Sequence, residues 1–285
     1  MLTPELLKWT SEQTELRTRK YFLDHALPNP GPITYHHDPS APDILSVEGV
    51  QLCSIKELGL VFMDTEMAPL HGGAWLLCQE ILNKYRGQMY PTGIPSLQAL
   101  LRLIVDDEDR ETANGRLAIP SETFFNLGAA LIVHAIMHDG THMGRSERFE
   151  KYLPKLGIAS DERFARTFAD QFLGPGSEAP PWSSPDQALY LNLAYSYQIL
   201  MGLALILDQS RFFYTEDGYF GYGSLEIQPG DFVCALKGCE FPVILRRTDE
   251  EFKFVGTCVV QGLVDEGVLT SLIGGTESLE SFDIH

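Results

Sequence analysis

Three histidines near the middle of the chain stand at helical spacing. His134, His138 and His142 are four residues apart, so one continuous helix would place their imidazoles on a single stripe. Such a stripe can hold a metal ion or hydrogen-bond a reacting carbonyl. Gly140 ends the predicted helix before His142, and Ala135 stands where a zinc protease has its glutamate. We therefore expect no metal or other cofactor, and we take His138 and His134 as candidate catalytic residues.

A second candidate group lies on a long helix without charge. No charged residue occurs between Asp186 and Asp208, and 188–207 is long enough to cross a bilayer. Its tyrosine, asparagine and glutamine side chains would need polar partners in lipid, and no basic cluster flanks it. We expect the buried central helix of a bundle and no membrane span. A buried tyrosine hydroxyl needs a partner, so Tyr197 is the third candidate catalytic residue.

Side chains that could line an apolar pocket belong to the same predicted helices. The uncharged helix carries two of them, a helix from about 124 to 139 carries two more, and an earlier helix carries a tryptophan. These candidate substrate-binding residues are Trp75, Phe124, Met137, Tyr190 and Ser196. The alternative for each is ordinary core packing.

Other polar clusters have simpler interpretations. Asp64, Glu66 and His71 could do acid–base work or could form a helix-entry turn. The acidic run 106–109 lacks the glycine and the spacing of a calcium loop. The sequence also lacks the glycine-rich nucleotide motifs, the serine nucleophile elbow and zinc spacings. The remaining possibilities are an enzyme that needs only a shaped apolar pocket and a few hydrogen bonds, or a protein without catalytic activity.

Composition excludes several classes of partner. The 21 lysines and arginines against 39 aspartates and glutamates give a formal net charge of −18. A chain this acidic repels phosphate backbones and anionic lipid, so we expect neither nucleic acid nor a membrane surface as a partner. Five cysteines without a C-x-x-C pair argue against a disulfide framework. The cysteine content and the lack of a signal-peptide pattern at the first residues together predict a cytoplasmic protein.

Periodicity predicts an α+β fold: a mostly helical bundle with a small C-terminal β-barrel-like sheet. The hydrophobic period is helical up to about 210 and becomes two beyond Arg211. A hairpin over 44–56, turning at Gly49, can join the sheet. Gly218, Gly223 and Gly230 are expected to take positive φ in turns. The predicted domains are 1–58 (helix, loop and hairpin), 59–210 (helical), 211–266 (small β domain) and 267–285 (peripheral tail).

The predicted strands carry a family resemblance. The segments in question are RFFYTEDGYFGYG at 211–223, PGDFVC at 229–234, PVILR at 242–246 and FVG at 254–256. In this order they resemble the C-terminal region of fungal heterokaryon-incompatibility (HET) domain proteins. LSVEGV at 45–50 and IKELG at 55–59 resemble the segment that follows the HET domain. The likeness covers about 40–265, and nothing in the sequence resembles the HET domain itself.

The resemblance implies a shared scaffold and does not transfer the cell-death signalling role. Stand-alone proteins of this kind occur in fungal natural-product pathways, where cyclases including Diels–Alder pericyclases have been recruited. We therefore predict a cofactor-independent cyclase of fungal specialised metabolism, acting on an apolar polyene or terpenoid small molecule. The alternative is a non-enzymatic HET-family incompatibility or regulatory binding protein. A homodimer stays open, and a metal-dependent enzyme ranks last.

Overall fold

The computed structural model divides the chain into two compact units. The β unit comprises Met1–Leu58 and Arg211–His285, and the helical unit comprises Gly59–Ser210. The structure describes residues 35–37, 44–62, 73–86, 88–105, 121–137, 143–180, 210–237, 241–249, 251–263 and 279–285, with single residues at 182–203 and at 239. Of 35–37 and 121–124 it describes the backbone alone.

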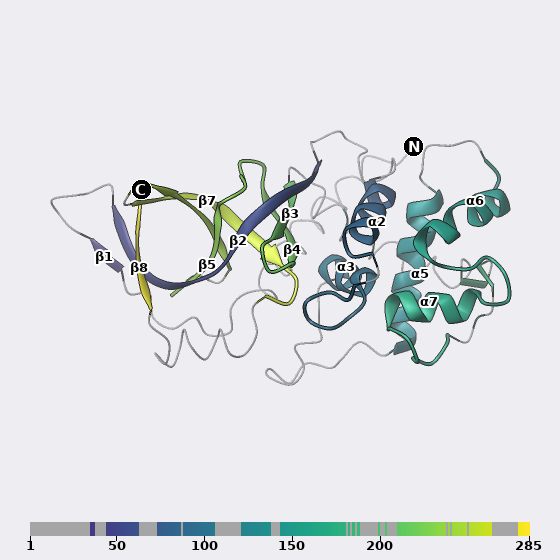
Figure 1. The fold of residues 1–285 in the computed structure, drawn as a ribbon. Helices are drawn as coiled ribbons and strands as arrows, with labels where there is room; N and C mark the ends of the chain where they lie inside the picture. The colour runs from purple at the N-terminus through teal and green to yellow at the C-terminus, as the bar shows by residue number, and fades with distance from the viewer. Residues whose placement is uncertain are drawn as a thin grey trace, which may run out of the picture. The chain divides into compact units, whose positions relative to one another are not determined.

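The described residues form an α+β fold, as predicted (Figure 1). The helices are α2 (Gly73–Lys84), α3 (Ser96–Val105), α5 (Ser121–Met137), α6 (Arg145–Tyr152) and α7 (Phe164–Phe172), with the 3-10 helix η2 (Leu153–Leu156). The strands are β1 (Tyr35–His37), β2 (Leu45–Phe62), β3 (Ser210–Thr215), β4 (Phe220–Ser224), β5 (Phe232–Leu236), β6 (Val243–Thr248), β7 (Glu251–Val260) and β8 (Glu280–Ile284). Strands and helices occupy similar numbers of described residues, so the prediction of a mostly helical protein was wrong.

The strands pair into one sheet that closes on itself. The order is β1-β2-β3-β4-β7-β6-β5, and β5 pairs back with β2. β8 pairs with both β2 and β7. Six strands therefore form a closed ring, which leaves few open edges. This agrees with the barrel-like closure that the spacing of the short strands predicted.

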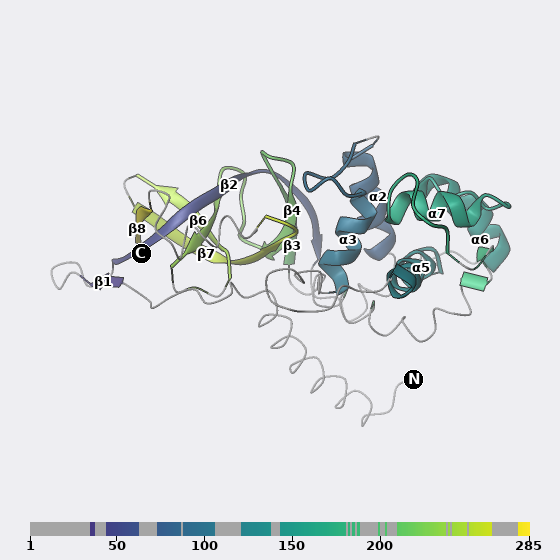
Figure 2. The same cartoon turned by 90° about the horizontal axis from the view of Figure 1, so that it is seen from below.

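The predicted 44–56 hairpin was wrong, because this segment lies within one continuous strand. β2 has 18 residues, and Figures 1 and 2 show it as a single long, curved strand. Gly49 does not turn the chain. It lies opposite Leu236 of β5, where a Cβ would come within 2.6 Å of the Ala235 carbonyl oxygen. The glycine therefore permits close approach of two strands, which is the other common reason for glycine inside a strand.

The β unit has a hydrophobic core on each face of the β5–β6–β7 wall. The first core contains Cys53, Ile55, Phe213, Ile227, Val233, Ile244, Val255, Cys258 and Val260. The second core contains Val47, Cys234, Leu236, Val243, Leu245, Phe282 and Ile284. Neighbouring residues of β5 and β6 alternate between the two sets, as side chains of a strand buried on both faces must.

A β-bulge lets β2 contribute to both cores. Gln51 pairs with Cys234 and Cys53 with Val233, so β2 advances two residues while β5 advances one. The extra residue, Leu52, shifts the odd-numbered side chains to the other face. Val47 consequently packs in the second core, whereas Cys53 packs in the first.

β7 also contains a β-bulge, which moves its buried side chains from one core to the other. Leu245 of β6 pairs with Phe254, and Ile244 pairs with Gly256, which leaves Val255 as the extra residue. Val255, Cys258 and Val260 pack in the first core, while Phe252 packs against the second. Two bulges therefore allow one continuous sheet to enclose two separate cores.

The C-terminal strand completes the second core. β8 pairs antiparallel with β2, Leu45 opposite Ile284, and meets β7 at Phe252. Phe282 is almost fully buried. The segment 267–285, predicted as a peripheral tail, thus contains a strand that pairs within the sheet. The alternating pattern that would predict β8 is short, since only two apolar residues alternate with serine and aspartate.

Two of the three predicted positive-φ glycines are confirmed. Gly218 has φ of 82° and Gly230 has φ of 90°, as tight turns require. The prediction for Gly223 was wrong, because it is not among the described glycines with positive φ. A Cβ there would lie 2.9 Å from the carbonyl oxygen of Thr257, so Gly223 is needed for close strand contact.

The helical unit is built around α5, which contacts α2, α3, α6 and α7 (Figures 1 and 2). Phe164, Phe168 and Phe172 stand four residues apart on α7 and form its buried face. Phe168 stacks on Phe172 with centroids 4.6 Å apart, and a Cβ at Gly128 of α5 would touch both rings. Of the helices that the structure describes, none has the length and apolarity of a bilayer-spanning segment.

Gly221→Ala should destabilise the β unit. The added methyl would overlap the carbonyl oxygen of Val259 and lie 2.9 Å from Val260 Cγ2. Overpacking of this kind lowers the free energy of unfolding by about 1–3 kcal/mol, measurable by urea denaturation. Gly144→Ala adds the same methyl with nothing within 4 Å and should change it by less than about 1 kcal/mol. Equal effects of the two substitutions would contradict the packing described at Gly221.

Candidate functional site

Helix α5 carries two polar side chains inside an apolar core. Apart from Glu122, its 17 residues have no acidic or permanently charged group. Asn126 and His134 are nevertheless 7% and 6% exposed. Buried polar groups of this kind are retained where they are hydrogen-bonded or where they contact a ligand.

One of the three predicted catalytic residues can be placed. His134 lies within α5 and is buried. His138 and Tyr197 lie outside the described residues, so their assignment as catalytic residues stays a prediction.

Two of the five predicted substrate-binding side chains can be placed. Trp75 is buried on α2 and meets the ring of Tyr152 edge-on, with centroids 4.8 Å apart. Met137 is the last residue of α5 and is half-buried. The backbone of Phe124 is on α5, but its side chain, like Tyr190 and Ser196 entirely, lies outside the description.

The placed residues lie on helices that pack against one another. α2 and α5 contact one another, as do α5 and α6. Tyr152, at the end of α6, is the neighbour of Trp75, while Met137 and His134 occupy the last turn of α5. The other clusters considered from sequence, at 64–71, at 106–109 and at His142, lie outside the described residues.

Arg148 is a site residue that sequence reasoning missed. Its buried guanidinium donates from Nη1 to the carbonyl oxygens of Ile136 at 3.2 Å and Met137 at 2.8 Å. Its Nε donates to the carbonyl oxygen of Met143 at 2.9 Å. One side chain of α6 thus satisfies carbonyls that the end of α5 leaves without helical partners and also holds the start of α6. The surrounding sequence, RSERFEKY, has the pattern of a short amphipathic helix, which does not mark Arg148 as a residue that binds carbonyls.

Two lysines flank the buried ring of Tyr152. The ammonium groups of Lys151 and Lys155 lie 4.9 Å and 5.0 Å from its centroid. A cation over an aromatic face is attracted by the ring quadrupole. With Trp75 against its edge, Tyr152 is held from several directions, which fixes the end of α6 near α2.

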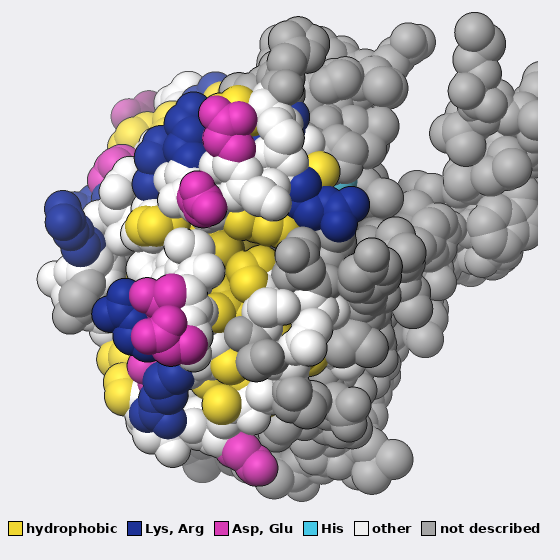
Figure 3. Space-filling model, turned by 90° about the vertical axis from the view of Figure 1, so that its right-hand side faces the viewer, with side chains coloured by type: hydrophobic (Ala, Val, Ile, Leu, Met, Phe, Trp, Pro, Cys, Tyr) yellow, Lys and Arg dark blue, Asp and Glu magenta, His cyan; other side chains and the backbone are white. Residues whose placement is uncertain are grey.

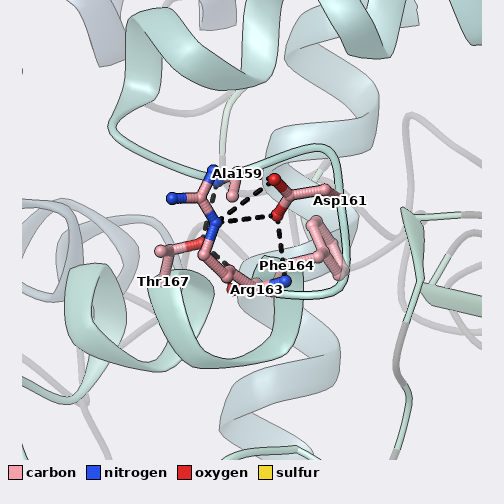
Figure 4. Close-up of polar contacts among 5 residues, drawn as sticks. All are labelled: Ala159, Asp161, Arg163, Phe164 and Thr167. Carbon is pink, nitrogen blue, oxygen red and sulfur yellow. Dashed lines mark hydrogen bonds and ion pairs between the residues drawn. The ribbon is translucent and has the colours of Figure 1, made fainter.

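The start of α7 carries an exposed ion pair, drawn in Figure 4. Arg163 Nη2 lies 2.7 Å from Asp161 Oδ2, and Nε lies 3.0 Å from Oδ1. Asp161 also accepts from the backbone N–H of Arg163 at 3.0 Å. These hydrogen bonds lower the pKa of Asp161 to about 2. The carboxylate therefore favours the folded state above its usual pKa, and this contribution is lost as pH falls towards 2.

Charges of both signs are interspersed on the face of the molecule shown in Figure 3. Acidic and basic side chains alternate around a hollowed band of hydrophobic side chains. Among the residues drawn in colour, neither sign covers a large continuous area.

The ring of the β unit contains a bidentate ion pair. Asp231 is 2% exposed and accepts from Arg246 Nε at 2.8 Å and from Nη2 at 2.9 Å. It also accepts from the backbone N–H of Gln228, while Arg246 donates to the carbonyl oxygen of Glu226. The hydrogen bonds to Asp231 raise the pKa of Arg246. This pair ties the turn before β5 to β6.

The thiols do not offer nucleophiles. Burial raises the pKa of Cys53, Cys78 and Cys234 to about 12, so they stay protonated at neutral pH, and the thiolate is the reactive form. All five cysteines are free. Across the part of the chain that the structure describes, no three histidine, cysteine, aspartate or glutamate side chains are arranged to hold a metal.

The comparison with protein families concerns mainly the β unit, together with the last residues of the helical unit. Residues 190–274 match the family model of the Het-6 β-barrel domain. The matched range includes β3 to β7, which supports the predicted HET-related C-terminal region. It does not include β2, which pairs with both β3 and β5 and so closes the ring. No curated protein and no solved structure matches the chain.

Arg148→Met should destabilise the helical unit. Methionine keeps much of the buried volume but removes the donors to Ile136, Met137 and Met143. Leaving buried carbonyls unsatisfied lowers the free energy of unfolding by about 2–3 kcal/mol, which thermal denaturation measures. The control, Arg163→Ala, removes a solvent-screened pair and should leave stability nearly unchanged. An Arg148→Met protein as stable as the wild type would show that these hydrogen bonds do not secure α5.

The Asp231–Arg246 pair should respond asymmetrically to substitution. Arg246→Met leaves a buried carboxylate without its counter-charge and should cost about 3 kcal/mol. Asp231→Asn leaves the arginine, whose side chain is 23% exposed, free to reach water and should cost less. The double variant should cost less than the sum of the two. Additive losses in urea denaturation would contradict direct coupling of the pair.

Proposed function

We propose that this chain is a non-enzymatic binding or regulatory protein of the heterokaryon-incompatibility type, with the closed strand ring as its scaffold. The match of 190–274 to the Het-6 β-barrel domain is the observation that carries this proposal. It is the alternative that the sequence analysis left open beside a cyclase.

The chemistry of the ring supports a scaffold more than a reaction centre. The buried ionisable groups of the ring include thiols whose pKa is raised by burial and the Asp231–Arg246 pair. The thiols are protonated, and the ion pair is occupied in joining a turn to a strand. Reactive groups differ from both, since they are accessible and have a pKa suited to proton transfer or attack.

The second candidate is a cofactor-independent cyclase acting on an apolar polyene or terpenoid in the helical unit. The observation that favours it is the buried polar pair Asn126 and His134 on an apolar helix. His134, with the predicted His138 and Tyr197, would hydrogen-bond a substrate carbonyl as charge develops. Apolar walls that include Trp75 and Met137 would hold the reacting carbons together, an effect worth up to about 7–11 kcal/mol.

One fungal host can test both functions. A strain expressing the chain is fused with strains that each carry a HET-domain gene, and growth of the fusion cells is scored. The same strain, carrying a polyene or terpenoid pathway, is profiled for products. The proposed function predicts growth arrest in at least one fusion and unchanged product ratios.

Variants assign the outcome to a unit. Gly221→Val, which overfills the ring, should abolish growth arrest, whereas His134→Ala should retain it. Altered product ratios that disappear with His134→Ala, without any growth arrest, would replace the binding role with the cyclase. No effect in either assay would contradict both functions.

A further inference from the structure

Strand β8 closes a second ring in the β unit. β8 pairs with β2 and β7, while β7 pairs with β6, β6 with β5 and β5 with β2. All five strands supply side chains that form the second core or pack against it. β8 lies beside the first part of β2 (Figure 1). We call its position the β8 slot, bounded by Leu45–Gly49 of β2 and by Phe252 of β7.

The two sides of the slot hold β8 unequally. Five residue pairs join it to β2 in antiparallel register. Among the described residues, one parallel pair, Phe252 opposite Ile284, joins it to β7, and the backbone N–H of His285 donates to the Phe252 carbonyl oxygen at 2.9 Å. Parallel pairs are also slightly less stable than antiparallel ones. Of the pairings described in the second ring, the one between β7 and β8 is therefore the weakest.

Two side chains anchor β8 in the slot. Three of its five residues are exposed, and the other two, Phe282 and Ile284, are buried in the second core. The Phe282 ring meets the ring of Phe252 edge-on, with centroids 5.2 Å apart. In β5, by contrast, four of the five residues are buried. The slot therefore has two apolar subsites, separated by one residue that faces outward.

These anchors hold β8 less firmly than the strands of the first ring are held. The free energy gained by burying two side chains is of the same order as the conformational entropy lost when five residues are ordered. The side-chain contacts of Asp283 with Ser46 and of His285 with Glu251 are exposed, so solvent screens them. Release of β8 should therefore require much less free energy than unfolding of the whole sheet.

We propose that the β8 slot is a binding site for an extended segment of a partner protein, with two large apolar residues separated by one residue, and that β8 is its displaceable occupant. β8 itself shows that the slot has room for such a segment. A strand added to a sheet gains affinity from main-chain hydrogen bonds and specificity from alternate side chains. This inference names a kind of partner for the binding role proposed above and rests on that role.

A synthetic peptide of the β8 sequence, ESFDIH, tests the slot by fluorescence anisotropy on the purified full chain. In the wild type the peptide competes with β8. The double variant Phe282→Ser, Ile284→Ser removes both anchors of β8, so it should bind the peptide at least about tenfold more tightly. Ser281→Ala, a change at an exposed position of β8, should bind it like the wild type. A peptide with serine in place of both apolar residues should not bind.

Thiol labelling of the wild type gives a second readout that needs no variant. Cys234 packs in the second core with Phe282, whereas Cys258 packs in the first core. Burial, and to a smaller extent the nearby Cys53 and Glu280, raise the pKa of Cys234 to about 12. Release of β8 exposes Cys234 alone, so iodoacetamide should label it at least about tenfold faster than Cys258. Excess ESFDIH peptide should slow this labelling, which peptide mass spectrometry measures.

Failure of the ESFDIH peptide to bind the folded double variant, or equal binding of the serine peptide, overturns the proposal. If circular dichroism shows that the double variant is unfolded, labelling of the wild type decides. Labelling of Cys234 that is no faster than that of Cys258, or that the peptide does not slow, also overturns the proposal. Growth arrest in the fusion assay together with any of these results would exclude the slot and leave the proposed function standing.

Discussion

The β5–β6–β7 wall has a hydrophobic core on each face, and the rest of the β unit depends on this arrangement. A strand buried on both faces loses its polar alternation, so each core needs further strands to cover it. β2 and β7 are long enough to serve both cores, but an unbroken strand keeps its odd-numbered side chains on one face. The bulges at Leu52 and Val255 remove that restriction. Gly49 and Gly221 then let neighbouring strands approach where a Cβ would collide with the backbone.

The strands that could be predicted are those whose signal is local. The segments of β3 to β7 have a hydrophobic period of two and are separated by turns that contain glycine, proline and acidic residues. This local pattern predicts that each strand exists. β2 was mispredicted because a glycine inside an alternating segment favours a turn, while the actual reason for Gly49 is a partner nearly two hundred residues away. β8 was missed for the same kind of reason, since the strands that pair with it, β2 and β7, are distant in sequence. The continuous strand β2 and the two-core arrangement depend on contacts between residues distant in sequence, which hydrophobic periodicity does not predict.

The candidate site was partly foreseeable. Helical spacing placed Trp75, His134 and Met137 on the correct helices, because apolar helices bury most of what they carry. Arg148 was not foreseeable, since an arginine among glutamates predicts solvent exposure and the carbonyls it binds lie 5, 11 and 12 residues earlier. Asn126 was overlooked because a single asparagine in an apolar helix is unremarkable until its acceptor is found without a partner. Both residues are recognised only by counting hydrogen bonds in three dimensions.

The two units divide the functional argument between them. The ring carries the relation to the Het-6 β-barrel domain, and its buried thiols and ion pair serve packing. The helical unit carries the side-chain oxygen of Asn126, which is buried on α5 without a hydrogen-bond partner among the described residues. Hydrogen–deuterium exchange on the wild type and Gly221→Ala tests the role of strand packing in the ring most directly. The account predicts faster exchange in peptides of Gly221→Ala that cover 232–260 and unchanged exchange in peptides that cover 125–137. Unchanged exchange in the strands, or equally faster exchange along α5, would contradict it.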